Sequence, residues 1–381
     1  MRRVLLIMAA AGLLVAATPA QAALVGEAPA SSWQTDGKVN AIVVANGKIY
    51  IGGSFTHVTP PGGGAAVARN HLAALDANTG ALKPWNPGAN DIVNALAVKP
   101  NGKTIYAGGH FTKVHGATRL HVAAINATSS TLRPWKANTN GKVDVIINNK
   151  KRVYIGGTFT TLKGHTRNRL GAVSAASSAA LVAWTPHASS EVYSLQLSAT
   201  GKRIYVGGAF DHMNGKPANH LSAIKTAGAG AIAKKFHYHP TYPVFSLALA
   251  GQTLYVGGAG NGGHVTAVNF KTSHARWDVL TDGDVRAITL RKGVVYVGGH
   301  FNNYCQNHQG DGQNPLHCVT PTGRRKFLAL NEATGHLTTW NPIGNSVQGV
   351  FAIRSNKKQV MAGGSFTVVH GVNQSGFARF T

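Results

Sequence analysis

The carboxylates are the residues with the clearest catalytic potential in this chain, and they are scarce. The 381 residues include 12 Asp and Glu against 37 Lys and Arg, which gives a formal net charge of +25. Asp91, Glu191, Asp282 and Asp284 precede or open short apolar runs that are typical of strands, and Asp144 stands inside one. Asp91, Glu191 and Asp284 are the catalytic candidates among them. Two carboxyl groups at a suitable separation could act as general acid and base in glycoside cleavage. The same carboxylates could instead form ion pairs with cations such as Lys142 or Arg286.

A second group of polar residues recurs in loops that follow Gly-Gly pairs. The candidates for ligand binding in these loops are Arg69, His71, Arg119, Arg167, Arg169, His220, Arg324 and Arg325. Arginine binds carboxylate, phosphate or sulfate bidentately, so a face lined by such residues could hold an anionic ligand. Several of them share one repeat position, however, and a repeated position is also kept for packing or for capping loop carbonyls. Because equivalent positions of different repeats lie apart, we expect no metal site.

The excess of positive charge predicts an anionic partner. A field of this sign attracts polyanions over long range. The candidates are an anionic wall polymer, an acidic polysaccharide or a protein at the cell surface, while the alternative is that the charge only aids solubility. The sequence contains no nucleophile elbow, phosphate loop or acidic calcium ladder, so we expect no cofactor.

The first 22 residues predict export. A basic start, an apolar run from residue 4 to residue 17 and the Ala-Gln-Ala motif at residues 20–22 are typical of a secretory signal peptide. The apolar run is too short to span a bilayer comfortably, and no later segment is longer. We therefore expect residues 23–381 to form a single secreted domain without a membrane span. The two cysteines, Cys305 and Cys318, would then form one disulfide bond within a loop.

The elements that must position these residues follow from a repeated phrase. A β-branched or aromatic run closes on Gly-Gly seven times, with first glycines at 52, 108, 156, 207, 257, 298 and 363. A period near 50 residues built from strand-like segments is typical of an array of blades. Each repeat contains four strand-like runs joined by Gly, Asn and Pro turns, and a sheet of this kind buries its faces by radial stacking.

The ends of the chain predict how the array closes. The last repeat stops at Phe380-Thr381, after its third strand, whereas the chain around Trp33 resembles a fourth strand without a repeat of its own. We therefore predict an all-β, seven-bladed β-propeller with four-stranded blades, in which the strand around Trp33 completes the last blade.

One family resemblance supports this architecture. The phrases Tyr50 to Phe55, Arg69 to Asp76 and Thr79 to Pro87 resemble the repeats of delta-60-repeat β-propellers of secreted bacterial proteins. The resemblance covers essentially the whole mature chain and implies the fold, but no common activity. It departs at the fifth repeat, which lacks the long loop, and at the sixth, which carries the cysteine insertion.

Taken together, the sequence favours a secreted, monomeric binding or scaffold propeller rather than an enzyme. Its basic loop face would recognise an anionic cell-surface polymer, glycan or protein. The alternatives are a glycan-active hydrolase or lyase that uses the axial carboxylates, and a purely structural envelope protein.

Overall fold

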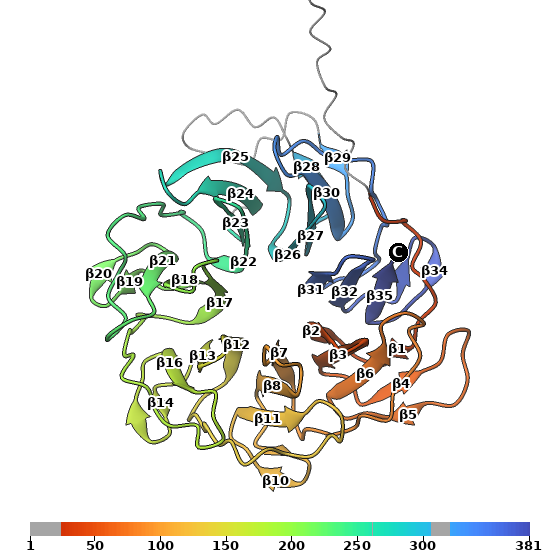
Figure 1. Cartoon of the computed structure of the whole chain (residues 1–381). Helices are drawn as coiled ribbons and strands as arrows, with labels where there is room; N and C mark the ends of the chain where they lie inside the picture. Colours follow the sequence, from red (N-terminus) through yellow and green to blue (C-terminus); the bar gives the residue numbers. More distant parts are fainter. Residues whose placement is uncertain (1–23, 261, 306–320) are drawn as a thin grey trace, which may run out of the picture.

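A computed structural model describes residues 24–260, 262–305 and 321–381. These residues form strands, turns and loops without any helix, which confirms the all-β prediction. The strands are arranged as sheets that radiate from a central axis (Figure 1). Residues 1–22 and Cys318 lie outside the described residues, so the signal peptide and the disulfide bond stay predictions. Cys305 is buried at the end of β28 (Asn303–Cys305).

Each sheet at the axis is an antiparallel meander of consecutive strands, and we name each unit by its first strand. The sheets are β2 (Val39–Ala45), β3 (Lys48–Gly53) and β6 (Leu72–Asp76); β7 (Val93–Val98), β8 (Thr104–Gly109) and β11 (Val122–Asn126); β12 (Val143–Asn148), β13 (Arg152–Gly157) and β16 (Leu170–Ser174); β17 (Val192–Leu197), β18 (Arg203–Gly208) and β21 (Leu221–Lys225); β22 (Val244–Ala250), β23 (Thr253–Gly258) and β24 (Gly263–Asn269); β26 (Val285–Arg291), β27 (Val294–Gly299) and β30 (Phe327–Asn331); β31 (Val350–Ser355), β32 (Val360–Gly364) and β35 (Phe377–Phe380). In every unit the first strand lies nearest the axis (Figure 1).

The expected fourth strand is reduced in most of these units. In the β2, β7, β12, β17 and β26 units it makes a single bridge to the third strand, as between Leu75 and Leu82. Pro84 follows two residues after Leu82, and a proline has no N–H with which to continue the ladder. In the β22 unit the fourth strand is complete as β25 (His274–Thr281), whose sequence contains no proline. That sheet is extended by β28 and β29 (Thr322–Gly323).

The Gly-Gly pairs allow neighbouring units to approach closely. A Cβ added at Gly52 would lie 2.6 Å from Cγ1 of Val93, the first residue of the next unit's inner strand. A Cβ added at Gly53 would overlap the carbonyl oxygen of Lys38 within the same unit. The second strand therefore needs glycine at both positions, for two different contacts, as the repeat predicts.

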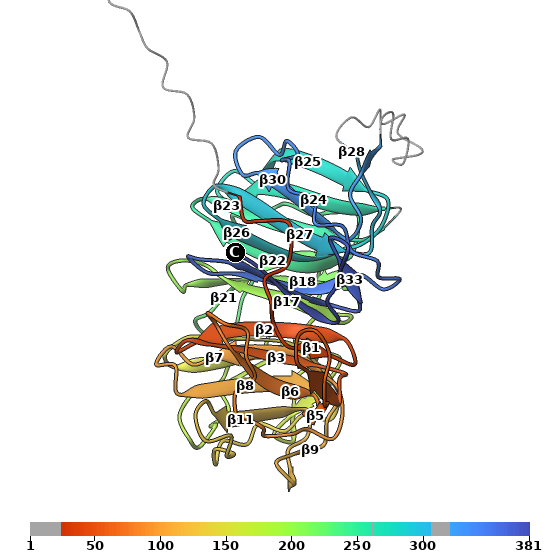
Figure 2. The same ribbon diagram turned by 90° about the vertical axis from the view of Figure 1, so that its right-hand side faces the viewer.

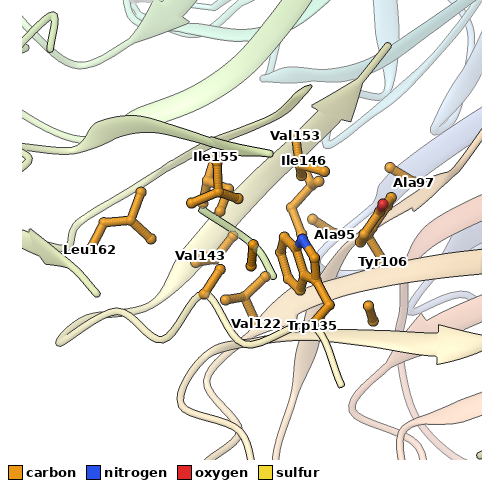
Figure 3. Packing of buried hydrophobic residues seen from close by; sticks show 14 of the residues in the cluster. Ala95, Ala97, Tyr106, Val122, Trp135, Val143, Ile146, Val153, Ile155 and Leu162 are labelled. Atoms are coloured by element: carbon orange, nitrogen blue, oxygen red, sulfur yellow. The ribbon is translucent and has the colours of Figure 1, made fainter. Parts of the chain in front are cut away.

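Aromatic side chains fill the wider outer gaps between units. Tyr106 packs against Trp135 with ring centroids 5.1 Å apart, and Trp135 donates its indole N–H to the carbonyl oxygen of Ser174 in the next unit, 2.8 Å away. Val143 and Ile146 of the β12 unit complete this buried cluster (Figure 3). Because the indoles of Trp85, Trp135, Trp184 and Trp277 all bond to the following unit, the packing links units as well as sheets.

The N-terminal segment pairs with the end of the chain. The N–H of Gly26 donates to the carbonyl oxygen of Thr381 at 2.9 Å, and the N–H of Ala30 donates to that of Arg379 at 2.7 Å. Figures 1 and 2 both show this segment passing beside the C-terminus on its way to β2. It then forms β1 (Gln34–Thr35), which pairs with β4 (His57–Thr59) of the β2 unit.

The register of this segment differs by one residue from the sequence alignment. The hydrogen bond of Ala30 to the third strand matches that of Lys83 in the β2 unit. Two residues further on, Trp85 and Ser32 therefore occupy equivalent positions, and Ser32 is buried at 1% exposure. Trp33 comes one residue later and is only partly buried. The shift has a local cause, since β1 must begin at residue 34 to reach β4.

Candidate functional site

A ring of side chains lines the axial cavity, which has a volume of ≈ 170 Å³. In each inner strand the pairing register shifts directly after the first valine, so the second residue has no cross-strand partner. Such a bulge redirects the side chain that it leaves unpaired. The side chains placed in this way around the cavity are Asn40, Asn94, Asp144, Tyr193, Phe245, Arg286 and Phe351.

One half of the ring is a polar network. Asn94 donates its side-chain amide to Oδ1 of Asp144 at 3.0 Å, and Lys142 Nζ lies 3.3 Å from the same oxygen. Lys142 also pairs with Glu191. Burial would lower the pKa of Lys142, but the pair with Glu191 and the charge of Asp144 raise it overall. The lysine therefore stays charged and fixes both acids.

Asp144 is the most perturbed acid of the cavity. Burial raises its pKa to about 7, the negative charge of Glu191 adds to the rise, and Lys142 opposes it. Its second oxygen, Oδ2, is buried and has no hydrogen-bond partner among the described residues. At neutral pH this carboxyl can therefore hold a proton and donate a hydrogen bond into the cavity.

The other half of the ring combines aromatic rings with a cation. The guanidinium of Arg286 lies 4.8 Å from the ring centre of Phe245 and 5.4 Å from that of Phe351. Arg286 also donates to Asp284 at 2.7 Å. Tyr193 packs against Phe245 with centroids 5.0 Å apart, and burial together with Glu191 raises its pKa to about 12. This half offers stacking surfaces and a neutral hydroxyl rather than a base.

The three carboxylates that the sequence favoured as catalytic candidates all have local partners. Glu191 pairs with Lys142 and Asp284 with Arg286, while Oδ1 of exposed Asp91 accepts the N–H of Ile92 at 2.6 Å. This arrangement supports the ion-pair interpretation of Glu191 and Asp284. The acid with altered chemistry is instead Asp144, which stands inside the strand run rather than before it.

The recurrent arginines bind their own units. In Arg69, Arg119, Arg167 and Arg324 one terminal N–H donates to the preceding carbonyl at 2.7–2.8 Å, and another donates to a carbonyl beside the unit's outer segment at 3.2–3.3 Å. Bonds of this kind satisfy backbone acceptors of a loop. These four guanidinium groups therefore have a structural task, and most of their donors are not directed to solvent.

The residue type at the position before the third strand is explained by the backbone conformation there. His71, Arg169 and His220 lie at the position before the third strand with φ of 65°, 65° and 68°, and Gly376 has φ of 70° there in the β31 unit. A left-handed residue is needed at this turn, and the glycine in the last repeat was the signal for it. Within the described residues no three His, Cys, Asp or Glu side chains form a metal-binding group. Arg325 differs from the others in being exposed.

A second recurrent role went unrecognised in the sequence. Asp282 accepts the backbone N–H groups of Asn302 and Asn303 at 2.7 and 2.9 Å. Asn90 does the same for Thr112 and Lys113 in the β7 unit. A side-chain oxygen that caps two loop N–H groups holds the loop after the second strand in place. Asp282 thus belongs to the scaffold although it lies near the cavity mouth.

The opposite end of the channel carries a second group of cations, which includes seven exposed lysines. We define the hairpin face as the turns between first and second strands, where the chain places Lys48, Lys99, Lys103, Lys150, Lys151, Arg152, Lys202, Arg203, Arg291, Lys292, Lys357 and Lys358. No Asp or Glu stands within these turns in the sequence. Asp76 lies beside one of them, opposite Lys48, but it is paired with Lys83, and Glu332 lies beside another, where its N–H donates to the carbonyl oxygen of Gly293. The exposed lysines at positions 103, 150, 151, 202, 292, 357 and 358 make no side-chain hydrogen bond or ion pair with a described residue.

Comparisons with known proteins identify the architecture only. No protein-family model matches the chain, and no curated protein matches it. Among solved structures, the WD40 β-propeller domain of Doa1 is similar with a TM-score of 0.57 and 11% identity over 93% of this chain and 96% of that one. The computationally designed Ika8 protein is similar with a TM-score of 0.56 and 13% identity over 93% and 99%. At these identities the likeness shows a WD40-like β-propeller fold and nothing about activity.

The described residues contain no helix with the length and apolar character needed to span a membrane. A propeller fold is compatible with a binding or scaffold role, since many functions use this architecture through their surfaces. The surfaces of this molecule therefore decide what it can bind.

Proposed function

We propose that this chain is a secreted, non-enzymatic binding or scaffold protein whose hairpin face holds an anionic polymer of the cell surface. In this proposal residues 1–22 are a signal peptide, and the remainder is a seven-bladed propeller of the delta-60-repeat type. The N-terminal segment completes the last blade through its pairing with Arg379 and Thr381. The disulfide bond between Cys305 and Cys318 staples the long loop of the sixth blade.

The single observation that carries this proposal is the separation of charge between the two ends of the channel. Carboxylates such as Asp91, Glu191 and Asp284 stand where the inner strands begin, beside the loops that the sequence suggested as the binding face. The arginines of those loops are largely engaged by carbonyl groups. The exposed lysines of the hairpin face form no ion pair with a described residue, so a polyanion can gain attraction there without displacing one.

The test is binding of the mature protein to anionic polysaccharides at two salt concentrations. Affinity for a carboxylated or sulfated chain should fall at least about tenfold between 50 and 200 mM salt, because several exposed lysines act together. Reversing charge at Lys150, Lys151, Lys357 and Lys358 should weaken binding by a similar factor. The matched control reverses Lys113, an exposed lysine of the opposite face. Binding that ignores salt, or that is lost equally in the control, would refute the proposal.

One observation favours the enzymatic alternative enough to be tested in parallel. Asp144 combines a pKa near 7 with an unpaired oxygen at the cavity, which are properties of a general acid. Its neighbour Glu191 is held by Lys142, so a free second carboxylate is missing from the described part of the cavity. Turnover of any glycan that disappears in Asp144→Asn would establish catalysis and replace the binding proposal.

A further inference from the structure

Arg354 is one of the charged residues that line the axial cavity. It belongs to β31, and it lines the cavity together with Phe351 and Ile353 of the same strand. The side chain is exposed to the solvent of the channel, although protein surrounds it on every side. That surrounding lowers the pKa of Arg354 through desolvation, yet an arginine keeps its charge at neutral pH.

The fold does not use this guanidinium. Arg354 makes no side-chain hydrogen bond and no ion pair with any other described residue. Two other arginines of the strands behave differently. Arg286 pairs with Asp284, and Arg379 donates to the carbonyl oxygens of Ser31 and Asn78. A guanidinium that lines a cavity and has no partner in the fold keeps its donors available for a ligand.

The equivalent positions of the other inner strands carry no charge. Pairing with the second strand identifies them, because Arg354 opposes Met361 as Val43 opposes Tyr50. The equivalent residues are Val43, Ala97, Ile147, Gln196, Ala248 and Thr289. Arg354 is therefore the one charged residue among these seven, of which only Ile147 and Arg354 line the cavity. Since Ile147 fills the position in the β12 unit, the fold needs no arginine there.

The part of the hairpin face next to Arg354 carries positive charge as well. Lys357 and Lys358 stand in the turn that directly follows β31, and both are exposed. Thr289 lies at the same level, and its hydroxyl is 3.0 Å from that of Ser355, the residue after Arg354. A small anion that enters from the hairpin face would pass the exposed lysines of this turn and then meet the guanidinium of Arg354.

We propose that Arg354 is the binding residue for a single terminal anionic group, a carboxylate, phosphate or sulfate, that enters the channel from the hairpin face. The cavity of ≈ 170 Å³ has room for such a group with its bound waters, but not for a folded polymer. This inference rests on the proposed function in one respect, namely that the group is the end of the chain held by the hairpin face. The guanidinium supplies paired N–H donors for such a group.

The experiment measures binding of glucuronate, inorganic phosphate and sulfate, each as a free anion, by calorimetry on the mature protein. Arg354→Gln should weaken the preferred anion at least about tenfold, the effect of losing a charge-assisted pair of hydrogen bonds. Arg354→Ile should do the same, and it should fold because Ile147 occupies the equivalent position. Arg354→Lys should keep part of the affinity. Lys113→Gln is the matched control, because it removes one charge on the opposite face.

The outcomes separate this inference from the proposed function. If both substitutions at Arg354 leave anion affinity unchanged, or if none of the three anions binds, the inference is wrong. The hairpin face can still bind polymer in that case, and the charge reversals there report on it independently. If an anion binds through Arg354 but no anionic polymer binds, the channel site stands and the proposed function fails. The identity of the best anion tells carboxylated ligands from phosphorylated or sulfated ones.

Discussion

The indole N–H of Trp340 donates a hydrogen bond to the carbonyl oxygen of Gly26, 3.1 Å away, although 314 residues separate them. Other tryptophans of this kind bond to the third strand of the following unit, as Trp85 does to Asn126 at 2.9 Å. At the junction of the last units the N-terminal segment takes this place. The two ends of the chain are therefore tied by the same contact that links the units within it.

Loss of the N-terminal segment should destabilise the molecule far more than its length suggests. Deleting residues 24–31 removes the pairing with Arg379 and Thr381 and the acceptor of Trp340. Such a deletion exposes the edge of β35 and leaves a buried indole donor unpaired. We expect a lowered thermal midpoint and early proteolysis at both ends of the chain. Deleting the exposed glycines 62–64 is the control and should change neither property. Equal stability of the two deletions would contradict the role of the segment.

Much of the fold could be predicted from the sequence because its repeats record steric needs. Gly52 must be glycine since Val93 touches it, and the Tyr and Trp positions fill gaps of constant width. The register of the N-terminal segment could not be predicted, because β1 pairs with β4 rather than continuing alongside β35. Trp33 therefore looked like Trp85 in the sequence, while Ser32 takes its place.

The candidate site was harder to predict because it depends on bulges and rotamers. A regular alternation of inward and outward side chains along the strand would not distinguish Asp144. The bulge after Val143 directs its side chain to the cavity. The carbonyl partners of Arg119 depend on how its side chain turns back onto its own unit, and no spacing in the sequence reveals that. Arg354 looks like an exposed strand residue until the strand is placed at the axis.

Asp144 should make stability depend on pH. Burial raises its pKa to about 7, so the folded state holds the proton more tightly than the unfolded chain does. Its contribution is fully present below about pH 4 and is lost as pH rises through about 7. Wild type should therefore lose up to about 4 kcal/mol across this range relative to Asp144→Asn, which cannot ionise. Chemical denaturation at pH 4.5 and pH 8 measures the difference. Asp91→Asn, at the exposed mouth of the channel, is the control, and its free energy of unfolding should change with pH as that of the wild type does. If Asp144→Asn shows the same pH dependence as the wild type, the pKa of Asp144 is not raised by the fold.

A methyl group at Gly52 should separate two units. The added Cβ would lie 2.6 Å from Cγ1 of Val93, closer than carbon atoms approach in a packed core. Gly52→Ala should cost about 1–3 kcal/mol by overpacking. Because the clash has a single partner, Val93→Ala in the same chain should recover part of that loss. Gly323→Ala is the control, since a Cβ there meets nothing within 4 Å. If the double variant loses as much free energy of unfolding as the two single variants together, the strain lies elsewhere.

The recurrent arginines should matter for stability and not for ligand affinity. Arg119 is 6% exposed, and it donates to the carbonyl oxygens of Thr118 and Arg133 at 2.8 and 3.2 Å. Arg119→Met keeps the packing of the stem but leaves these acceptors without their donors, which should cost about 1–3 kcal/mol. Arg325→Met, in an exposed position of the corresponding loop of the β26 unit, should cost less than about 0.5 kcal/mol. Both variants should bind an anionic polysaccharide as the wild type does, because the binding lysines lie on the hairpin face. A stable Arg119→Met protein with weakened polymer binding would return the ligand to the loop face that the sequence first suggested.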